Sequence, residues 1–261
     1  MSAPRLNAPP INEVVCGFIL QSMPELTPQV HGTYWERRRD TFPKCEAQPI
    51  IVDEPVPPVF IGSGFTCRTW LLGTDETRLV QLQHDRFYVN WRRRNEEDEY
   101  PRFSPGQGRK SLLPFALEEY GHFSEFCKAF LAMEPRLMAA ELTKIDILRQ
   151  GVHWSDAADL GKLVPATAPI LGSVSGDDRE LAMRVSGVGV SSMPLSVNMA
   201  TGKEIATQKT VLRIETRGRK QIQDLHALEA DFKALNEELN ETFFSLLARN
   251  ELHRFSVEVA K

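Results

Sequence analysis

Two short runs of arginine, each beside a tryptophan, are the residues of this sequence best suited to bind another molecule. Residues 37–39 are all arginine and follow Trp35, and residues 92–94 are all arginine and follow Trp91. A guanidinium group binds phosphate or carboxylate through paired hydrogen bonds and stacks on aromatic rings. The pattern predicts an interaction surface for phosphate or an acidic partner, although a plain solvated face has the same composition. The surface consists of Trp35, Arg37, Arg38, Arg39, Arg92, Arg93 and Arg94.

Acidic residues in the second half of the chain give an incomplete version of a metal-dependent nuclease pattern. That pattern needs an acidic residue followed, on a strand, by a glutamate and a lysine two residues apart. Glu141 and Lys144 are spaced too widely, and Glu215 is followed at that spacing by Arg217 instead of lysine. Asp146 and Glu215 could still meet across a sheet and bind a hard cation, because such ions prefer carboxylate oxygens.

Histidine and cysteine spacing favours structural roles over metal binding. The six histidines never lie three to five residues apart, and no cysteine pair accompanies them, so we expect no metal site. His84 and Asp85 are adjacent, which is more typical of a turn than of an acid–base pair. The four cysteines, at positions 16, 45, 67 and 127, are far apart in the sequence and are expected to be buried free thiols.

Two glycine-rich segments lack the residues that phosphate binding or acyl transfer would need. The turn at Gly62, Ser63 and Gly64 has neither the third glycine of a dinucleotide fingerprint nor a Walker lysine. Residues 172–176 resemble a nucleophile elbow, but valine occupies the central position where the hydroxyl should be. The sequence therefore predicts no catalytic residues and no cofactor.

The second arginine run ends a stretch, residues 79–94, that predicts a hairpin. Apolar and polar residues alternate on both sides of the His84–Asp85 turn, as in strands with one face on a core and one in water. Phe87, Val89 and Trp91 would share the buried face. The solvated face would carry Gln81, Gln83, Tyr88, Asn90 and Arg92, and residues 68–72 would add a third antiparallel strand.

The same stretch resembles the signature of a sporadically distributed family of uncharacterised bacterial proteins of about this length. The segments that carry the resemblance are LVQLQ, DRF and NWRR, followed by Tyr100, Pro101, Arg102 and Phe103. The opening residues 10–14 and a closing helix with Asn236 and Asn240 also fit. The resemblance implies a bacterial intracellular setting and supplies no catalytic residues.

The other elements indicate an α+β fold of antiparallel sheets with packed helices, arranged as two ferredoxin-like or helix-grip-like halves. Residues 1–154 form the first half, with the proline-rich residues 43–60 as an extended crossing or loop; residues 155–261 form the second. The apolar seam of the final helix favours packing on a sheet over a coiled coil. Strands are predicted at residues 12–21, 142–154, 181–191, 195–199 and 209–217, and helices at 27–40, 111–133, 156–163 and 224–249.

Composition excludes some partners and leaves two classes of function. The net charge of −4 gives no global attraction to nucleic acid or anionic membrane, and no apolar run is long enough to cross a bilayer, so a cytoplasmic protein is expected. We expect a non-catalytic protein-interaction subunit, part of a bacterial defence or mobile-gene-encoded complex. Its partner would be another protein, or a second copy through the C-terminal helix. The alternative is a nucleotide- or nucleic-acid-binding module or enzyme that uses arginine contacts to anions.

Overall fold

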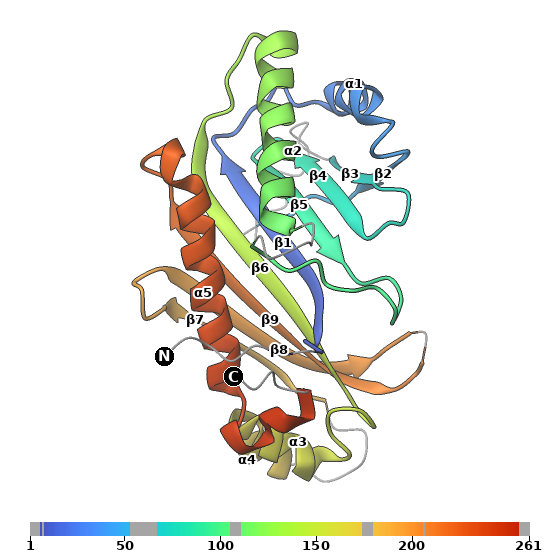
Figure 1. Ribbon diagram of the computed structural model, residues 1–261, viewed down its shortest axis with the longest axis vertical. Helices are drawn as coiled ribbons and strands as arrows, with labels where there is room; N and C mark the ends of the chain where they lie inside the picture. The colour runs from blue at the N-terminus through green and yellow to red at the C-terminus, as the bar shows by residue number, and fades with distance from the viewer. Residues whose placement is uncertain are drawn as a thin grey trace, which may run out of the picture. The chain divides into compact units, whose positions relative to one another are not determined.

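A computed structural model describes residues 6, 8–52, 67–104, 111–173, 180–205 and 207–255. Its strands form one nine-stranded antiparallel sheet with the order β2-β3-β4-β5-β1-β6-β9-β8-β7 (Figure 1). The α+β class is thus confirmed, with a single sheet in place of separate ones. The strands are β1 (Ile11–Leu20), β2 (Lys44–Gln48), β3 (Arg68–Leu72), β4 (Arg78–Gln83), β5 (Arg86–Arg92), β6 (Leu137–Arg149), β7 (Ala182–Val188), β8 (Pro194–Lys203) and β9 (Thr210–Gln221).

Four of the five α-helices lie close to the positions that the sequence predicts, and α4 is not predicted. Thr27 caps α1 by accepting a hydrogen bond from the Val30 backbone, and Pro28 occupies the first turn, where a missing N–H costs nothing. A π-helical turn, Cys127–Leu131, extends α2. The helices are α1 (Pro28–Arg38), α2 (Leu112–Phe126), α3 (Ala157–Leu163), α4 (Ala168–Gly172) and α5 (Leu228–Leu246), with 3₁₀ segments at Pro165–Thr167, Leu225–Ala227 and Arg249–Phe255. None of the helices in the described ranges is long and apolar enough to cross a membrane.

By their internal contacts the residues form two compact units that interleave in sequence. The hairpin unit consists of Val14–Leu142 and Lys220–Lys233; the terminal unit consists of Met1–Glu13, Thr143–Arg219 and Ala234–Lys261. The division at residues 154/155 stays a prediction about domains. It differs from this partition because residues 1–13 and most of β6 belong to the terminal unit, and because the last helix contributes to both units.

Aromatic rings fill the core of the hairpin unit, where α1 and α2 pack on one face of the sheet (Figure 1). Tyr120 of α2 stacks on Phe18 of β1 at 4.3 Å between centroids, and Phe123 stacks on Phe87 of β5 at 4.7 Å. Phe232, from the start of α5, meets Phe18 edge-on at 5.3 Å. The aromatic stripe of α2 is therefore core, because each turn of the helix places a ring on the sheet.

Two predicted boundaries in this region are wrong. The segment expected to be a loop between residues 43 and 60 contains β2, which pairs with β3 from Lys44 to Gln48 in the stretch between its first two prolines. The rest of that expectation, from residue 53 on, lies outside the described residues, as does the Gly62–Gly64 turn. The strand expected at 142–154 runs instead from Leu137 to Arg149, because Gly151, at φ 81°, breaks the extended backbone.

The terminal unit has its own apolar core under α3, α4 and the later turns of α5. Leu148 of β6, Leu212 and Ile214 of β9, and Phe243 of α5 are buried there together. β7, β8 and β9, which correspond to the three strands predicted in this half, pair antiparallel at the end of the sheet. Leu235 and Leu239 of the α5 seam are fully buried. These two positions therefore pack within the chain and are not exposed for a coiled coil.

Candidate functional site

The first arginine run lies at the end of α1, and its members have different surroundings. Arg37 packs over the Phe126 ring at 5.2 Å, and Arg39 over the Trp35 ring at 5.1 Å. Trp35 is fixed in turn, because its indole N–H donates to the Phe42 carbonyl at 2.8 Å. Arg37 and Arg39 are thus cations stacked on aromatic rings at a helix end, and Arg39 also pairs with Glu36 at 3.4 Å.

Arg38 points the other way, toward α2, and is already neutralised. Its Nη2 donates to Glu119 Oε1 at 2.6 Å, and Glu119 is only 2% exposed. Burial raises the pKa of Glu119 above its ordinary value, although Arg38 opposes the change. Tyr34, one helical turn before Arg38, is also buried, and burial together with Glu119 raises its pKa. Arg38 therefore holds α1 on α2 and is not part of an exposed anion surface.

The second arginine run gathers around Glu76, a residue that the sequence analysis does not single out. Arg94 pairs with the Glu76 carboxylate at 3.0 Å, Arg92 donates to the Glu76 carbonyl at 3.0 Å, and Lys44 also bonds the carboxylate. The hydrogen bond from Lys44 and the charges of Lys44, Arg94 and Arg92 hold the pKa of Glu76 below its ordinary value. Arg93 lies half-buried between its neighbours. Arg38 of the first run therefore meets Glu119, whereas Arg92 and Arg94 of the second run meet Glu76.

The polar side of the hairpin is buried, which corrects the prediction that it faces water. Gln81 accepts hydrogen bonds from Arg68 Nη1 at 2.8 Å and from Trp70 Nε1 at 3.0 Å, and it donates to Asn90 Oδ1 at 2.9 Å. Gln81 is 6% exposed and Asn90 is fully buried. Because a buried amide must find partners, this network fixes the register of β3, β4 and β5 to one another.

The polar network continues toward β6 through Arg86 and Tyr88. Arg86 donates to both carboxylate oxygens of Asp85, at 2.9 and 2.7 Å, and Tyr88 Oη donates to Glu141 at 2.8 Å. A Cβ added at Gly17 would lie 2.8 Å from the Tyr88 ring, so only glycine lets the tyrosine cross β1 at this point. The signature thus has two halves: its apolar residues build the core, and its polar residues build this network.

His84 and Asp85 form the turn between β4 and β5 that the alternation predicts. Burial opposes ionisation of Asp85, but hydrogen bonds from Arg86 and Gln83 outweigh it and lower the pKa of the carboxyl. The four cysteines are free thiols; Cys16 and Cys127 are buried as expected, whereas Cys45 is exposed and Cys67 is intermediate.

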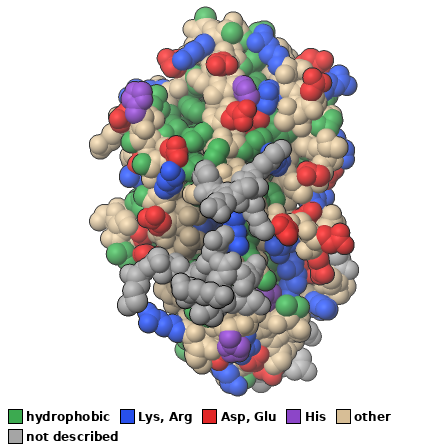
Figure 2. Space-filling model, in the orientation of Figure 1, with side chains coloured by type: hydrophobic (Ala, Val, Ile, Leu, Met, Phe, Trp, Pro, Cys, Tyr) green, Lys and Arg blue, Asp and Glu red, His purple; other side chains and the backbone are tan. Residues whose placement is uncertain are grey.

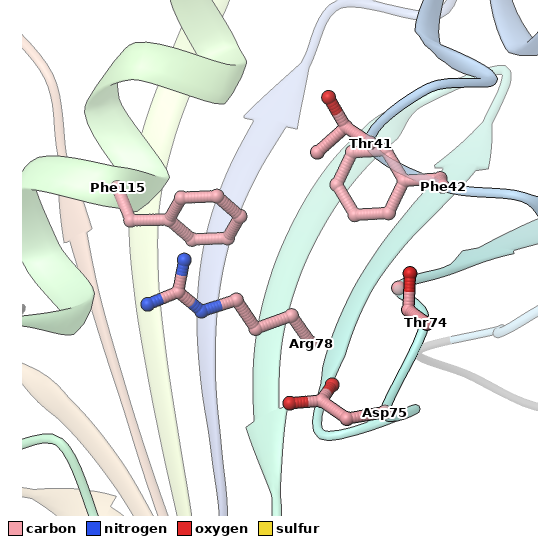
Figure 3. Close-up of a pocket in the computed structure, with 7 residues that line it drawn as sticks. Thr41, Phe42, Thr74, Asp75, Arg78 and Phe115 are labelled. Atoms are coloured by element: carbon pink, nitrogen blue, oxygen red, sulfur yellow. The ribbon is translucent and has the colours of Figure 1, made fainter.

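A pocket of about 490 Å³ opens beside the β3–β4 turn of the hairpin unit, and the sequence analysis missed it (Figure 3). Arg78 reaches across it and lies on the Phe115 ring of α2 at 4.3 Å from the ring centroid. The rest of the lining consists of Thr41 and Phe42, just after α1, and Gly73, Thr74 and Asp75, in the turn. No local pattern identifies this set, because its members come from three elements far apart in the sequence.

Below α5, the terminal unit holds a buried polar cluster. Lys144 Nζ donates to Asn236 Oδ1 and to Asn240 Oδ1, both at 2.6 Å, which explains the two asparagines of the closing helix. Asp146, two residues along β6, is buried as well, and burial raises its pKa to about 7 while Lys144 opposes the rise. Lys144 and Asp146 lie on one face of β6, toward α5.

The predicted meeting of Asp146 with Glu215 is wrong. The backbone bond from Gln150 to Thr210 sets a β6–β9 register that places Asp146 opposite Ile214, so Glu215 points to the other face of the sheet. Glu215 bonds Arg213 and Asn198 there. Within the described ranges no group of three or more histidine, cysteine or acidic residues could hold a metal ion.

The last strand of the sheet, β7, is exposed along its length. Val185 is 58% exposed and Val188 is 71% exposed, although both belong to a regular strand paired with β8. A space-filling view shows that green apolar side chains also reach the surface elsewhere on one face of the molecule (Figure 2), so exposure alone does not distinguish β7. What distinguishes β7 is its position at the end of the sheet, because the backbone groups on its outer side face away from β8.

Comparison with known proteins does not identify the chain. No protein-family model, no curated protein and no solved structure matches the chain. The resemblance of the hairpin signature to a bacterial family is therefore an expectation from the residues alone.

Proposed function

We propose that the chain is a protein-interaction subunit that binds an extended segment of a partner protein along β7. The observation that carries this proposal is the combination of a regular seven-residue strand, its place at the end of the sheet, and its exposed valines. Strand addition is a common way to bind a peptide, since backbone hydrogen bonds give affinity and alternate side chains give specificity.

The hydrogen-bonding pattern identifies the backbone groups that an added strand would use. Gly189 N donates to Met193 O and Thr201 N donates to Leu181 O, so the odd-numbered residues of this region bond β8. The N–H and C=O groups of Ala182, Arg184, Ser186 and Val188 alternate with them and point to the outer edge. An extended partner segment would pair with these four residues.

The side chains of β7 indicate what sequence the partner segment would have. Val185 lies opposite Val197, which is in the apolar core, so an apolar residue beside Val185 would extend that core by one strand. Arg184, on the other face, lies opposite Asn198 and is exposed, so an acidic residue beside it would be favoured. The partner segment should therefore alternate apolar residues with polar ones that include an acid.

β7 is held in place before any partner binds. Glu238 of α5, only 5% exposed, accepts hydrogen bonds from the backbone of Val190 at 2.8 Å and of Ser191 at 3.2 Å, and it also bonds the Ser191 hydroxyl. These contacts fix the turn that follows the strand. A pre-organised edge favours binding, since little conformational entropy remains to be lost.

The setting we propose follows the resemblance of the hairpin signature. The chain would act in the bacterial cytoplasm as a subunit of a defence or mobile-gene-encoded complex, and its partner would be encoded in a neighbouring gene. Co-expression with the neighbouring genes, followed by purification of the tagged chain, should recover one stoichiometric partner.

The decisive comparison uses Ser186→Pro, which removes an outward N–H from β7 and leaves the bonds to β8 intact. A synthetic peptide of the recovered partner should bind the wild-type chain in calorimetry and lose measurable affinity for Ser186→Pro. The control is Ser196→Ala on the neighbouring strand β8, which keeps every backbone N–H of β7. Equal binding of the partner to wild type and Ser186→Pro would contradict the proposal, as would a complex that consists only of copies of this chain.

A further inference from the structure

The pocket beside the β3–β4 turn contains an arginine with a different environment from those of the two arginine runs. Arg78 lies on Phe115 through its guanidinium face, and among the residues that the structure describes no carboxylate lies within ion-pair distance of it. By contrast, Arg38, Arg92 and Arg94 already meet Glu119 or Glu76. Stacking on an aromatic ring leaves the edge of a guanidinium group available, and that edge carries the donors that bind an anion.

The rest of the pocket combines apolar walls with hydroxyl groups. Phe115 of α2 forms a partly exposed aromatic wall, Phe42 closes the other side and is fully buried, and Thr41 and Thr74 supply hydroxyls at the rim (Figure 3). Its volume of about 490 Å³ falls within the range of small-molecule sites, which are mostly apolar with a few well-placed polar groups.

One acidic residue in the lining limits the charge that a ligand can carry. Asp75 is exposed and accepts a hydrogen bond from the Thr77 backbone at 3.0 Å, which fixes it in the turn. In Figure 3 it lies near the Cα end of Arg78, away from the guanidinium group on Phe115. The lining thus has one guanidinium group and one carboxylate, which favours a ligand with one negative charge over a doubly charged phosphate.

We propose that this pocket binds a small monocarboxylate whose apolar or aromatic body lies against Phe115. The carboxylate would accept two parallel hydrogen bonds from Arg78, and the threonine hydroxyls would bond its outer oxygens or a polar substituent. This site lies in the hairpin unit and is separate from the β7 edge in the terminal unit, so it is independent of the proposed strand addition.

Binding can be tested on the full chain with three probes of increasing length: benzoate, phenylacetate and 3-phenylpropanoate. At least one should bind in calorimetry with a Kd on the order of 1 mM or tighter. The corresponding primary amide, which has the same shape and no charge, should bind about tenfold more weakly or not at all, because a hydrogen-bonded charge contributes about that much. Backbone amide NMR shifts should change at residues 73–78 and along the first turns of α2.

Variants then connect the binding to Arg78. Arg78→Gln should abolish binding of the carboxylate, Arg78→Lys should retain part of it, and Arg37→Gln, which removes an arginine stacked elsewhere on α2 residues, should leave it unchanged. The comparison of acid with amide needs only the wild-type chain, so it holds even if Arg78→Gln fails to fold. Equal affinity for acid and amide, or no binding by any of the three probes at about 10 mM, would overturn the proposal.

Discussion

Gln81 Nε2 donates a 2.9 Å hydrogen bond to Asn90 Oδ1 between the two strands of the hairpin, and both side chains are buried. The alternation of the sequence places these residues on the solvated face. Their burial means that the hairpin has two interior faces, one aromatic and one polar. The two faces make different demands: the aromatic face needs volume, whereas the polar face needs every donor and acceptor to be paired.

Replacing the central amide of the polar face should destabilise the fold. Gln81→Ala removes the acceptor of Arg68 and Trp70 and the donor to Asn90, so the network across β3, β4 and β5 loses three hydrogen bonds. We expect a loss of about 2–4 kcal/mol in the free energy of unfolding, measured by urea denaturation. Gln48→Ala, at the end of the edge strand β2, is the control and should change stability by less than about 0.5 kcal/mol. A loss no larger than that of the control would mean that the network is dispensable.

Removing an aromatic side chain from the other face, at Trp91, should lower the free energy of unfolding by more than Gln81→Ala does. The Trp91 side chain is 3% exposed and packs on Tyr100 at 5.3 Å between ring centroids, so Trp91→Ala should cost about 3–5 kcal/mol. Arg92→Ala should cost about 1 kcal/mol, because it removes one hydrogen bond to Glu76 and the stacking on Trp70 at 5.2 Å. Thermal melts of both variants make the comparison, and equal small losses would show that Trp91 does not contribute to a core.

Two glycines near the edge strand form a matched pair. A Cβ at Gly189 would overlap the Glu238 carboxylate, whereas a Cβ at Gly187 would meet nothing within 4 Å. Gly189→Ala should therefore displace the Glu238 bonds and cost about 1–3 kcal/mol. Gly187→Ala should be neutral or slightly stabilising, because alanine lowers the entropy of the unfolded chain. Chemical denaturation checks both, and similar effects would mean that Glu238 does not hold the turn.

Asp146 predicts a dependence of stability on pH. Its folded pKa is raised by burial to about 7, above the ordinary value of 3.8, so the folded state keeps a proton that the unfolded state loses. Between these two pKa values the unfolded state binds fewer protons than the folded state. The contribution of Asp146 to stability is therefore complete below about pH 4 and is lost as pH rises toward about 7. Asp146→Asn should flatten this part of the profile, measured as the free energy of unfolding from pH 4 to pH 8. The control is Asp40→Asn, an exposed residue just after α1, which should leave the slope of the profile in place. A wild-type stability that rises with pH through the same window, with Asp146→Asn unchanged, would contradict the assignment.

The sequence by itself determined the local elements and the α+β class. Period-two alternation gives β3, β4 and β5 nearly to the residue, Thr27 and Pro28 mark the start of α1, and the three-and-four spacing of apolar residues gives α2 and α5. These signals are local, because each depends only on how a strand or a helix presents its own side chains. The arginine runs are also visible in the sequence, as are the asparagines of α5.

Only the tertiary structure decided which faces are covered and which groups meet. Gln81 and Asn90 alternate like solvated residues, yet Arg68, Trp70 and Glu141 come from other strands to make that face interior. The pocket at Arg78 depends on Phe115, which lies on a different element and far along the chain. β7 became an edge because of the order of nine strands, and its sequence alternates much like that of β8. Burial, pairing and edge position depend on residues distant in sequence, so no local period encodes them.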